Sequence, residues 1–483
     1  MVSVIVSRNF ASLYRCGFRC VLGDLGMLGS PYDKESIDSI YEFSLKLVGK
    51  SLADVADLPL GLENIRNKGN LGTLVEKYFF KHTPPNTAAP DFPDAPLELK
   101  TAGVTQDKKS RFRAKERLVL TDINYNRIKG ENWEHSTLLN KCQIMLLLFY
   151  LYEKEKPAVD RPFVINPLLV TFGIEENNSR ISMPHIRISE SDLAVIQADW
   201  EKIKAKIVAN KSHELSEGDT FFLGACRGGA GGEKEPGRIQ DGTAGVKSRR
   251  FALKASFISA LIEQGTQDYP SLRNSPMESI EDATNRYFMS FVGRSVDDIS
   301  SELGYFRKGK NHKGFYKNLA DRMLISEGME LAELRKGGVE LKTIRLTKTS
   351  RARESMSFNT IDIKEILEES WEDSDYFRKL ESKFLFAIFK EFEDGIERLW
   401  KVAYWNMPQS DINQARKVWE RTKAIIDVDP SKLPKMKDDF IAHVRPKARN
   451  GQKTERTSAG IPFVTQCFWL NGRYITEVVR GLP

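Results

Sequence analysis

The sequence has few cysteines, few histidines and no long apolar run. Its five cysteines are odd in number and scattered, and its six histidines show no metal-ligand spacing. This pattern is typical of free thiols in a reducing compartment and argues against a zinc site. The longest apolar run, residues 144–151, is far too short to span a membrane. We therefore expect a soluble, cytoplasmic protein.

The first 23 residues contain three arginines and no acidic residue. Such a composition resembles a transit peptide. Nothing else in the sequence indicates an organelle, so an upstream start codon, with Met27 as the natural start, is the favoured interpretation. Residues 1–30 are expected to lie outside the fold.

The rest of the chain is long, mixed in composition and basic. With 483 residues it exceeds one ordinary hydrophobic core, which predicts two or three domains. The net charge of +7 is compatible with a polyanionic partner. A merely basic enzyme explains the charge equally well, so the charge alone selects no function.

An internal repeat organises the chain. Residues 48–55 recur as 292–299, and Glu-Leu-Lys-Thr at 98–101 recurs at 340–343. Further matches occur in the same order with a slowly drifting offset, which chance does not readily produce. They join 68–69 to 313–314, 133–141 to 371–379, and 251–258 to 468–475.

The repeat predicts a tandem duplication of an α/β (mixed α+β) domain. The expected boundaries are 31–265 for the first copy, 266–275 for a linker and 276–483 for the second copy. Periodicity predicts helices at 36–47, 71–80 and 191–208, and strands at 97–104 and 117–123. Residues 138–152 stay ambiguous, and 251–262 are predicted to be a strand followed by a helix. The glycine-rich, charged stretch 224–245 is expected to be a long loop.

One segment of the first copy carries the residue types needed for phosphodiester hydrolysis. On a strand, Glu98 and Lys100 share a face while Leu97 and Leu99 point into a core. Asp91 precedes this strand across a proline-containing turn. Two carboxylates and an ammonium group would then converge, and carboxylate oxygens are the ligands that Mg²⁺ prefers.

Glu76 is the candidate for a third carboxylate. It lies off the apolar stripe of the predicted helix 71–80, and Gly72 stands one turn before it, leaving room for DNA or metal to approach. An isolated Glu-x-Lys is nearly always a solvated strand face. The combination with Glu76, Asp91 and the duplicated frame is far rarer, and it favours a nuclease.

These motifs resemble the MutH family. The segments KGNLGTLVEKYF, DFPDAPLELKT, KERLVL and NWEHSTLLNK carry the resemblance, which covers nearly the whole chain after residue 35. The length and the duplication are most similar to the two-domain, Sau-type restriction enzymes of that family, which cut at GATC. The resemblance implies a restriction-endonuclease-like core of a mixed sheet flanked by helices.

The resemblance also implies roles for particular residues. Glu76, Asp91 and Glu98 would bind Mg²⁺, Lys100 would lie beside the attacking water, and Lys141 would complete the catalytic set. Some DNA contacts follow from the family and others from a dense positive run at 108–117, whose alternative interpretation is a solvated hairpin. The predicted DNA-binding residues are Lys68, Gly69, Lys108, Lys109, Arg111, Arg113, Lys115, Arg117, Arg227, Arg250, Lys313, Arg445 and Lys447.

The second copy keeps an altered version of the same set. Asp321 stands at the position of Glu76, Glu333 at that of Asp91, and Glu340 at that of Glu98. Lys342 and Lys379 match Lys100 and Lys141. Because two carboxylates have changed length, and a misplacement of about 1 Å can cost on the order of a hundredfold in rate, we expect this copy to bind DNA and cut poorly.

These observations predict a type II restriction endonuclease. It would hydrolyse double-stranded DNA at GATC with Mg²⁺ and leave 5′-phosphate ends, while the second copy binds another site and stimulates cutting. Self-association on DNA and a cognate DNA methyltransferase in the same cell are the expected partnerships. Three alternatives stay open: both copies cut one strand each, the chain is a mismatch-repair nickase, or it is a DNA-binding regulator that does not cut.

Overall fold

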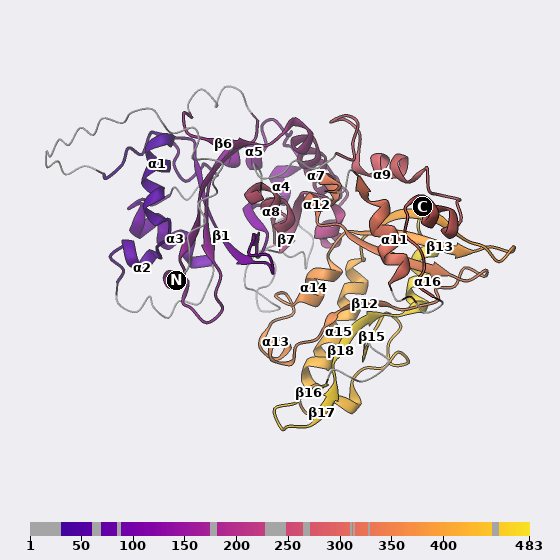
Figure 1. Cartoon of the computed structure of the whole chain (residues 1–483). Coiled ribbons are helices and arrows are strands. Elements are labelled where there is room, and N and C mark those ends of the chain that lie inside the picture. The colour runs from indigo at the N-terminus through magenta and orange to yellow at the C-terminus, as the bar shows by residue number, and fades with distance from the viewer. Residues whose placement is uncertain are drawn as a thin grey trace. The chain divides into compact units, whose positions relative to one another are not determined.

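The computed structural model describes residues 30–59, 69–84, 88–173, 181–227, 248–263, 271–309, 312, 314–326, 329–446 and 454–483. Packing divides the chain into two compact units (Figure 1). Unit 1 comprises residues 1–120 and 131–193, and unit 2 comprises residues 121–130 and 194–483. The described residues contain no helix long and apolar enough to cross a membrane. The predicted N-terminal segment lies outside them except for Ser30.

A five-stranded mixed sheet forms the centre of unit 1, in the order β2-β1-β4-β5-β6. Strand β1 runs parallel to β4, with Glu98 opposite Met145, and antiparallel to β2. Strand β4 is buried along almost its whole length, which explains its continuous apolar sequence. The strands are β1 (Glu98–Gln106), β2 (Phe112–Ala114), β4 (Ile144–Leu151), β5 (Phe163–Thr171) and β6 (His185–Arg187).

Short helices complete unit 1 and bury one face of this sheet. Their apolar residues pack with Leu97, Leu99 and the β4 residues Leu146 and Leu148 in one hydrophobic core. In Figure 1 the first three helices gather beside β1. The helices are α1 (Ile37–Ser44), α2 (Leu52–Val55) and α3 (Gly69–Leu74). Helix α5 (Thr137–Cys142) also belongs to unit 1, but its residues are not part of this core.

Unit 2 repeats the same strand arrangement. Strand β11 runs parallel to β13, with Glu340 opposite Phe384, and β13 runs antiparallel to β14. Two further three-stranded sheets match each other, in the orders β3-β8-β7 and β12-β18-β15. The strands are β3 (Leu118–Asp122), which begins in unit 1, β7 (Leu223–Arg227), β8 (Arg249–Leu253), β9 (Ile325–Ser326), β10 (Met329–Glu330), β11 (Glu340–Leu346), β12 (Met356–Thr360), β13 (Phe384–Glu391), β14 (Glu397–Trp405), β15 (Ala442–Pro446), β16 (Thr454–Arg456), β17 (Pro462–Val464) and β18 (Gln466–Leu470).

The helices of unit 2 surround a core rich in aromatic residues. Trp371 packs against Tyr376, Phe377 and Trp419, in one cluster with residues from β11, β13 and β18. The helices are α4 (Tyr125–Ile128), α7 (Glu190–Val208), which begins in unit 1, α8 (Ala255–Glu263), α9 (Ile280–Phe288), α10 (Val296–Glu302), α11 (Phe315–Met323), α12 (Ala332–Gly337), α13 (Ile363–Glu368), α14 (Asp375–Leu380), α15 (Gln409–Ile425) and α16 (Gly472–Arg480).

The packing of unit 2 crosses the repeat boundary. Phe221 of the first copy meets Tyr404 of the second edge to face, with ring centroids 5.3 Å apart. Lys383 Nζ donates to the Asp219 carbonyl at 3.2 Å, and Ser256 Oγ donates to the Lys336 carbonyl at 2.8 Å. The late part of the first copy therefore packs with the second copy, although the repeat in the sequence ends near residue 265.

Local structure agrees with most predicted elements and corrects two. The predicted helix 71–80 is α-helical only in α3 and continues as a π-helical turn, Val75–Phe79. The predicted loop 224–245 is wrong at its start, because Gly224 to Arg227 pair with β8 as part of β7. The rest of that stretch, from residue 228, lies outside the described residues.

Candidate active site

A tight turn brings Asp91 and Glu98 together in unit 1. Phe92 and Leu97 exchange two backbone hydrogen bonds of 2.9 and 3.1 Å, which closes the turn before β1. The Asp91 N–H then donates to Glu98 Oε2 at 3.0 Å, and the Leu99 N–H donates to Asp91 Oδ2 at 3.0 Å. His82 Nε2 lies 2.6 Å from the Asp91 carbonyl oxygen. The seven-residue spacing thus places both carboxyl groups at one point.

Two lysines face the Glu98 carboxylate. Lys100 Nζ donates to Glu98 Oε1 at 2.5 Å, as expected for neighbours on one strand face. Lys141 Nζ lies 3.4 Å from the same oxygen and comes from the last turn of α5. That helix begins at Ser136, whose buried hydroxyl accepts a hydrogen bond from the Leu139 N–H. Glu98 is fully buried, so both ammonium groups act on it with little screening by water.

Glu76 joins the group from the π-helical turn. Such turns displace a side chain from the regular helical face and occur often at functional sites. Leu71, Leu74 and Val75 are buried as predicted, while Glu76 is half-buried. One turn earlier, a side-chain carbon on Gly72 would lie 3.3 Å from the Thr101 hydroxyl of β1. The glycine therefore permits the close approach of α3 to the strand that carries the other site residues.

Burial and mutual repulsion disfavour the charged forms of the Glu76 and Glu98 carboxyl groups. Burial and the Asp91 charge raise the pKa of Glu76 to about 7. Burial also raises the pKa of Glu98, although Lys100 opposes the rise. For Lys100, burial alone would lower the pKa, but the charge and hydrogen bond of Glu98, together with the nearby Cys142 and Asp91, outweigh it and the pKa is raised. A bound cation would relieve the repulsion among three carboxylates.

The donor set fits a hard divalent cation. Glu76, Asp91 and Glu98 offer the oxygen ligands that Mg²⁺ prefers. In the part of the chain that the structure describes, no three acidic, histidine or cysteine side chains already form a metal-binding group. Both lysines lie on Glu98 Oε1, so the carboxylates are not arranged around a common centre. The residues fit the ion by their chemistry, and the metal roles of these three stay a prediction.

The second copy brings only part of the matching set together. Lys379 Nζ is hydrogen-bonded to Glu340 Oε1, and Lys342 Nζ lies 3.8 Å from Glu340 Oε2. Asp321 is paired with Lys317 on α11. Helix α14 begins as α5 does, at a buried serine, Ser374, whose hydroxyl accepts from the Phe377 N–H.

Glu333 does not share the site of its predicted counterpart. It lies on α12, and its carboxylate accepts from Ser271 Oγ at 2.6 Å and from the Leu272 N–H at 2.8 Å. It also forms a buried ion pair with Arg273, at 3.5 Å between Nε and Oε1. The seven-residue spacing from Glu340 is retained, but an α-helix replaces the turn of the first copy and turns the carboxylate toward residues 271–273.

Comparison with known proteins matches this site to one family. A family model described as DNA mismatch repair enzyme MutH matches residues 80–182 and 327–417, which contain β1 and β11 respectively. The type II restriction enzyme Sau3AI of Staphylococcus aureus is 28% identical, over 92% of this chain and 98% of that protein. The DNA mismatch repair protein MutH of Shewanella woodyi (strain ATCC 51908 / MS32) is 24% identical, over 49% of this chain and 94% of that protein.

The chain is similar to the MutH family in both of its copies. This confirms the resemblance inferred from the motifs, and the two matched stretches agree with a duplicated, restriction-endonuclease-like domain. These similarities support a site-specific nuclease that acts on DNA.

The predicted positive run, residues 108–117, begins in the hairpin between β1 and β2 and continues through β2. Lys108, Lys109 and Arg111 are exposed at the tip of the hairpin. Arg111 Nε donates to Asp107 Oδ2 at 2.8 Å, and Arg113 Nε lies 3.5 Å from the same oxygen. Lys115 Nζ lies 2.9 Å from the centre of the Tyr152 ring, and Arg117 is half-buried. The tip therefore offers exposed cations, and its contact with DNA stays a prediction.

Some of the other predicted DNA-contacting residues lie outside the described residues, and others are engaged in contacts within the protein. Lys68, Lys313 and Lys447 lie outside the described residues, and of Gly69 only the backbone is described, as the first residue of α3. Arg250 is paired with Asp122 at 2.6 Å and is partly exposed. Arg227 lies 3.6 Å from Glu372 and stacks over Phe377 at 5.1 Å, so its charge is engaged within unit 2.

Strands β15 and β18 carry an aromatic and cationic pair that the first copy lacks. Arg445 lies over the Trp469 ring at 4.1 Å, and Trp469 Nε1 donates to the Arg445 carbonyl at 3.0 Å. Strand register places Cys226 and Ala252 at the corresponding positions of β7 and β8. Arg445 is therefore held in a fixed orientation by residues of its own sheet.

Sequence reasoning did not identify the roles of Lys317 and Arg273. Lys317 occupies the position of Gly72, 245 residues later, and the offset shared by the two Lys-Gly pairs could have revealed it. Arg273 stands in the expected linker, where no motif indicates that it would take the Glu333 carboxylate. His82, which contacts the Asp91 carbonyl, has no signal in the spacing of the six histidines.

Proposed function

We propose that this chain is a type II restriction endonuclease that hydrolyses phosphodiester bonds in double-stranded DNA at GATC. It would use Mg²⁺ and leave 5′-phosphate ends. The first copy, residues 31–265, would carry the cutting site, and the second copy, residues 276–483, would bind another recognition site and stimulate cutting. Self-association on DNA, bridging two sites, is the arrangement that such stimulation favours.

The observation that carries this proposal is the turn that joins Asp91 to Glu98, with two lysines on the buried Glu98 carboxylate and Glu76 within the range of their charges. Asp91 and Glu98 are joined through the 3.0 Å hydrogen bond of the turn, and Lys100 contacts Glu98 directly. The charges of both carboxylates and of both lysines affect the pKa of Glu76. A non-cutting regulator would have no need to retain such a costly group of buried charges.

Glu76, Asp91 and Glu98 would hold the cation. Bound Mg²⁺ would supply polarisation of the phosphate and a reactive hydroxide at neutral pH. Lys100, kept charged by Glu98, would offset the negative charge that develops on the phosphate and orient the attacking water. Lys141 would hold the Glu98 carboxylate from the other side.

The role proposed for the second copy is supported by what it keeps and what it lacks. Glu333 is engaged by residues 271–273, so only Asp321 and Glu340 are left to match the three carboxylates of the first copy. Arg445, held against Trp469, is a side chain of the type that contacts guanine in DNA complexes. This pattern favours binding over cutting and disfavours the alternative in which each copy cuts one strand.

The first test is to map the DNA ends made with Mg²⁺ by wild type, Asp91→Ala and Glu340→Ala. We expect cuts at GATC in wild type and Glu340→Ala and none in Asp91→Ala. Asp94→Ala is the matched control, because this exposed carboxylate lies three residues from Asp91 in the same turn. Cutting that survives Asp91→Ala would remove the assignment of the site.

A second test separates the effector model from a nuclease in which both copies cut. Circular DNA with one GATC site should be cut poorly by wild type, and an added duplex that carries GATC should restore cutting. Equal rates on one-site and two-site DNA would contradict stimulation. DNA methylated at GATC by a cognate methyltransferase should resist cutting in a restriction–modification system.

A further inference from the structure

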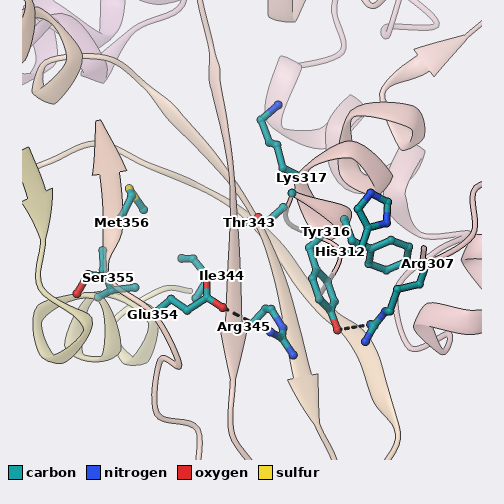
Figure 2. Close-up of a pocket in the computed structure, with 13 residues that line it drawn as sticks. Arg307, His312, Tyr316, Lys317, Thr343, Ile344, Arg345, Glu354, Ser355 and Met356 are labelled. Carbon is teal, nitrogen blue, oxygen red and sulfur yellow. Dashed lines mark hydrogen bonds and ion pairs between the residues drawn. The ribbon is translucent and has the colours of Figure 1, made fainter. Parts of the chain in front are cut away.

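The matching site of the second copy has gained a lysine. Lys317 occupies the position of Gly72, at the point where α11 approaches β11. It pairs with Asp321 and lines a cavity of about 400 Å³ together with Thr343 and Arg345 of β11. Figure 2 shows Lys317 and Tyr316 on α11 beside these strand residues. A cationic side chain thus stands at the position where, in the first copy, a glycine permits the close approach of helix and strand.

Two lysines contact the Glu340 carboxylate, and the charge of a third acts on it. Lys379 is bonded to Glu340, Lys342 lies 3.8 Å from it, and Lys317 acts on it from α11. Burial alone would raise the pKa of Glu340, but the lysines outweigh burial and the pKa is lowered. This is opposite to Glu98, whose pKa is raised. The Glu340 carboxylate is therefore already satisfied without a metal ion.

The residues present do not fit Mg²⁺. Glu333 is turned toward Arg273, and the carboxylate of Asp321 is occupied by Lys317. Two carboxylates face three lysines, whereas the first copy sets three carboxylates against two lysines. A divalent cation would meet net positive charge at this point, which is unfavourable. An anion would be attracted by the same net positive charge.

We propose that Lys317, Lys342 and Lys379 bind a backbone phosphate of DNA and that the second copy needs no divalent cation to do so. Each ammonium group has three donors, so one bond to a carboxylate leaves donors for a phosphate oxygen. The lysine side chains are between 22% and 46% exposed, which leaves them within reach of a ligand. The inference rests on the proposed role of this copy in DNA binding, which it deepens.

Binding of a labelled GATC duplex to the full chain in EDTA tests the inference. Wild type should bind, and Lys317→Gln should lower the affinity about tenfold. The slope of log K against log salt should fall by about 0.9 per lysine removed, reaching about 2.7 in the triple variant Lys317→Gln, Lys342→Gln, Lys379→Gln. Lys364→Gln is the matched control, an exposed lysine in the first turn of α13, well away from α11 in Figure 1.

A titration with Mn²⁺ in the absence of DNA provides an independent readout. Binding should be lost in Asp91→Ala and unchanged in Glu340→Ala. Loss of bound Mn²⁺ in Glu340→Ala would overturn the inference, and so would a Lys317→Gln affinity equal to that of Lys364→Gln. If the full chain bound GATC and unrelated duplexes equally even with Ca²⁺, the proposed function itself would fail, which is a distinguishable result.

Discussion

Replacing Glu333 with alanine should lower the free energy of unfolding of unit 2 and leave DNA cutting by the folded protein unchanged. The Glu333 and Arg273 side chains are only 4% and 2% exposed, and the carboxylate also accepts hydrogen bonds from Ser271 and Leu272. Removal of one partner from a buried ion pair costs about 3–5 kcal/mol, because the other charge is left without compensation. That is a large part of the roughly 5–15 kcal/mol that stabilises a typical domain.

Urea unfolding followed by tryptophan fluorescence suits this measurement. Six of the seven tryptophans lie in residues 194–483, so the signal reports mainly unit 2. For a urea slope of about 2 kcal/mol/M, the loss predicts a midpoint lower by about 1.5–2.5 M. Cutting at temperatures where the variant stays folded should be unchanged, because Glu333 is not part of the catalytic group.

Two comparisons make the result decisive. Glu302→Ala removes a carboxylate from the exposed pair with Arg294 and should cost no more than about 1 kcal/mol. The double variant Arg273→Met with Glu333→Met removes both buried charges and should recover most of the stability. If Glu333→Ala matched Glu302→Ala in stability but lost metal binding, Glu333 would be a metal ligand and our reading of α12 would be refuted.

Three further predictions concern catalysis, DNA binding and pH. Lys100→Met should lower the single-turnover cutting rate by about a hundredfold to a thousandfold, and a loss below tenfold would contradict a direct role. Replacing Lys108 and Lys109 with glutamine should reduce the salt slope of DNA binding by up to about 1.8, whereas an unchanged slope would indicate a merely solvated hairpin. Burial lowers the pKa of Lys383 from 10.5 to about 8. The folded chain then loses this proton at a lower pH than the unfolded chain does. The free energy of unfolding of wild type should therefore rise between pH 8 and pH 10.5 relative to that of Lys383→Ile. Isoleucine is chosen because Ile144 stands at this register in the first copy. Parallel stability curves would mean that the pKa of Lys383 is the same in the folded and the unfolded chain, which would refute the lowered value.

The geometry of the first site was largely predictable from the sequence. Strand alternation placed Glu98 beside Lys100, and the short proline-containing turn limited how far Asp91 could lie from them. The repeat predicted that Glu340 would occupy the same register as Glu98, and the pairings with Phe384 and Met145 agree. These inferences succeed because they depend on local backbone geometry.

The features that the sequence did not predict depend on packing between segments that are distant in the chain. The spacing of Glu333 matched that of Asp91, but spacing does not reveal that α12 forms or that Arg273 lies beside it. The π-helical turn at Val75–Phe79 changes which residues share a face, and no local pattern marks it. Likewise, the start of the predicted loop 224–245 pairs as β7 because residues 249–253 supply a partner strand. A contact between distant segments leaves little trace in either segment alone.

The interlocking of the two copies within unit 2 bears on how this protein could be dissected. A chain cut between residues 264 and 275 would separate Phe221 from Tyr404 and the Asp219 carbonyl from Lys383. It would also remove Arg335, the ion-pair partner of Glu263. A gene fragment ending at the repeat boundary would therefore encode an incomplete molecule with newly exposed apolar surface. Although the duplication is visible as two modules in the sequence, the contacts across its boundary tie the end of the first copy to the second.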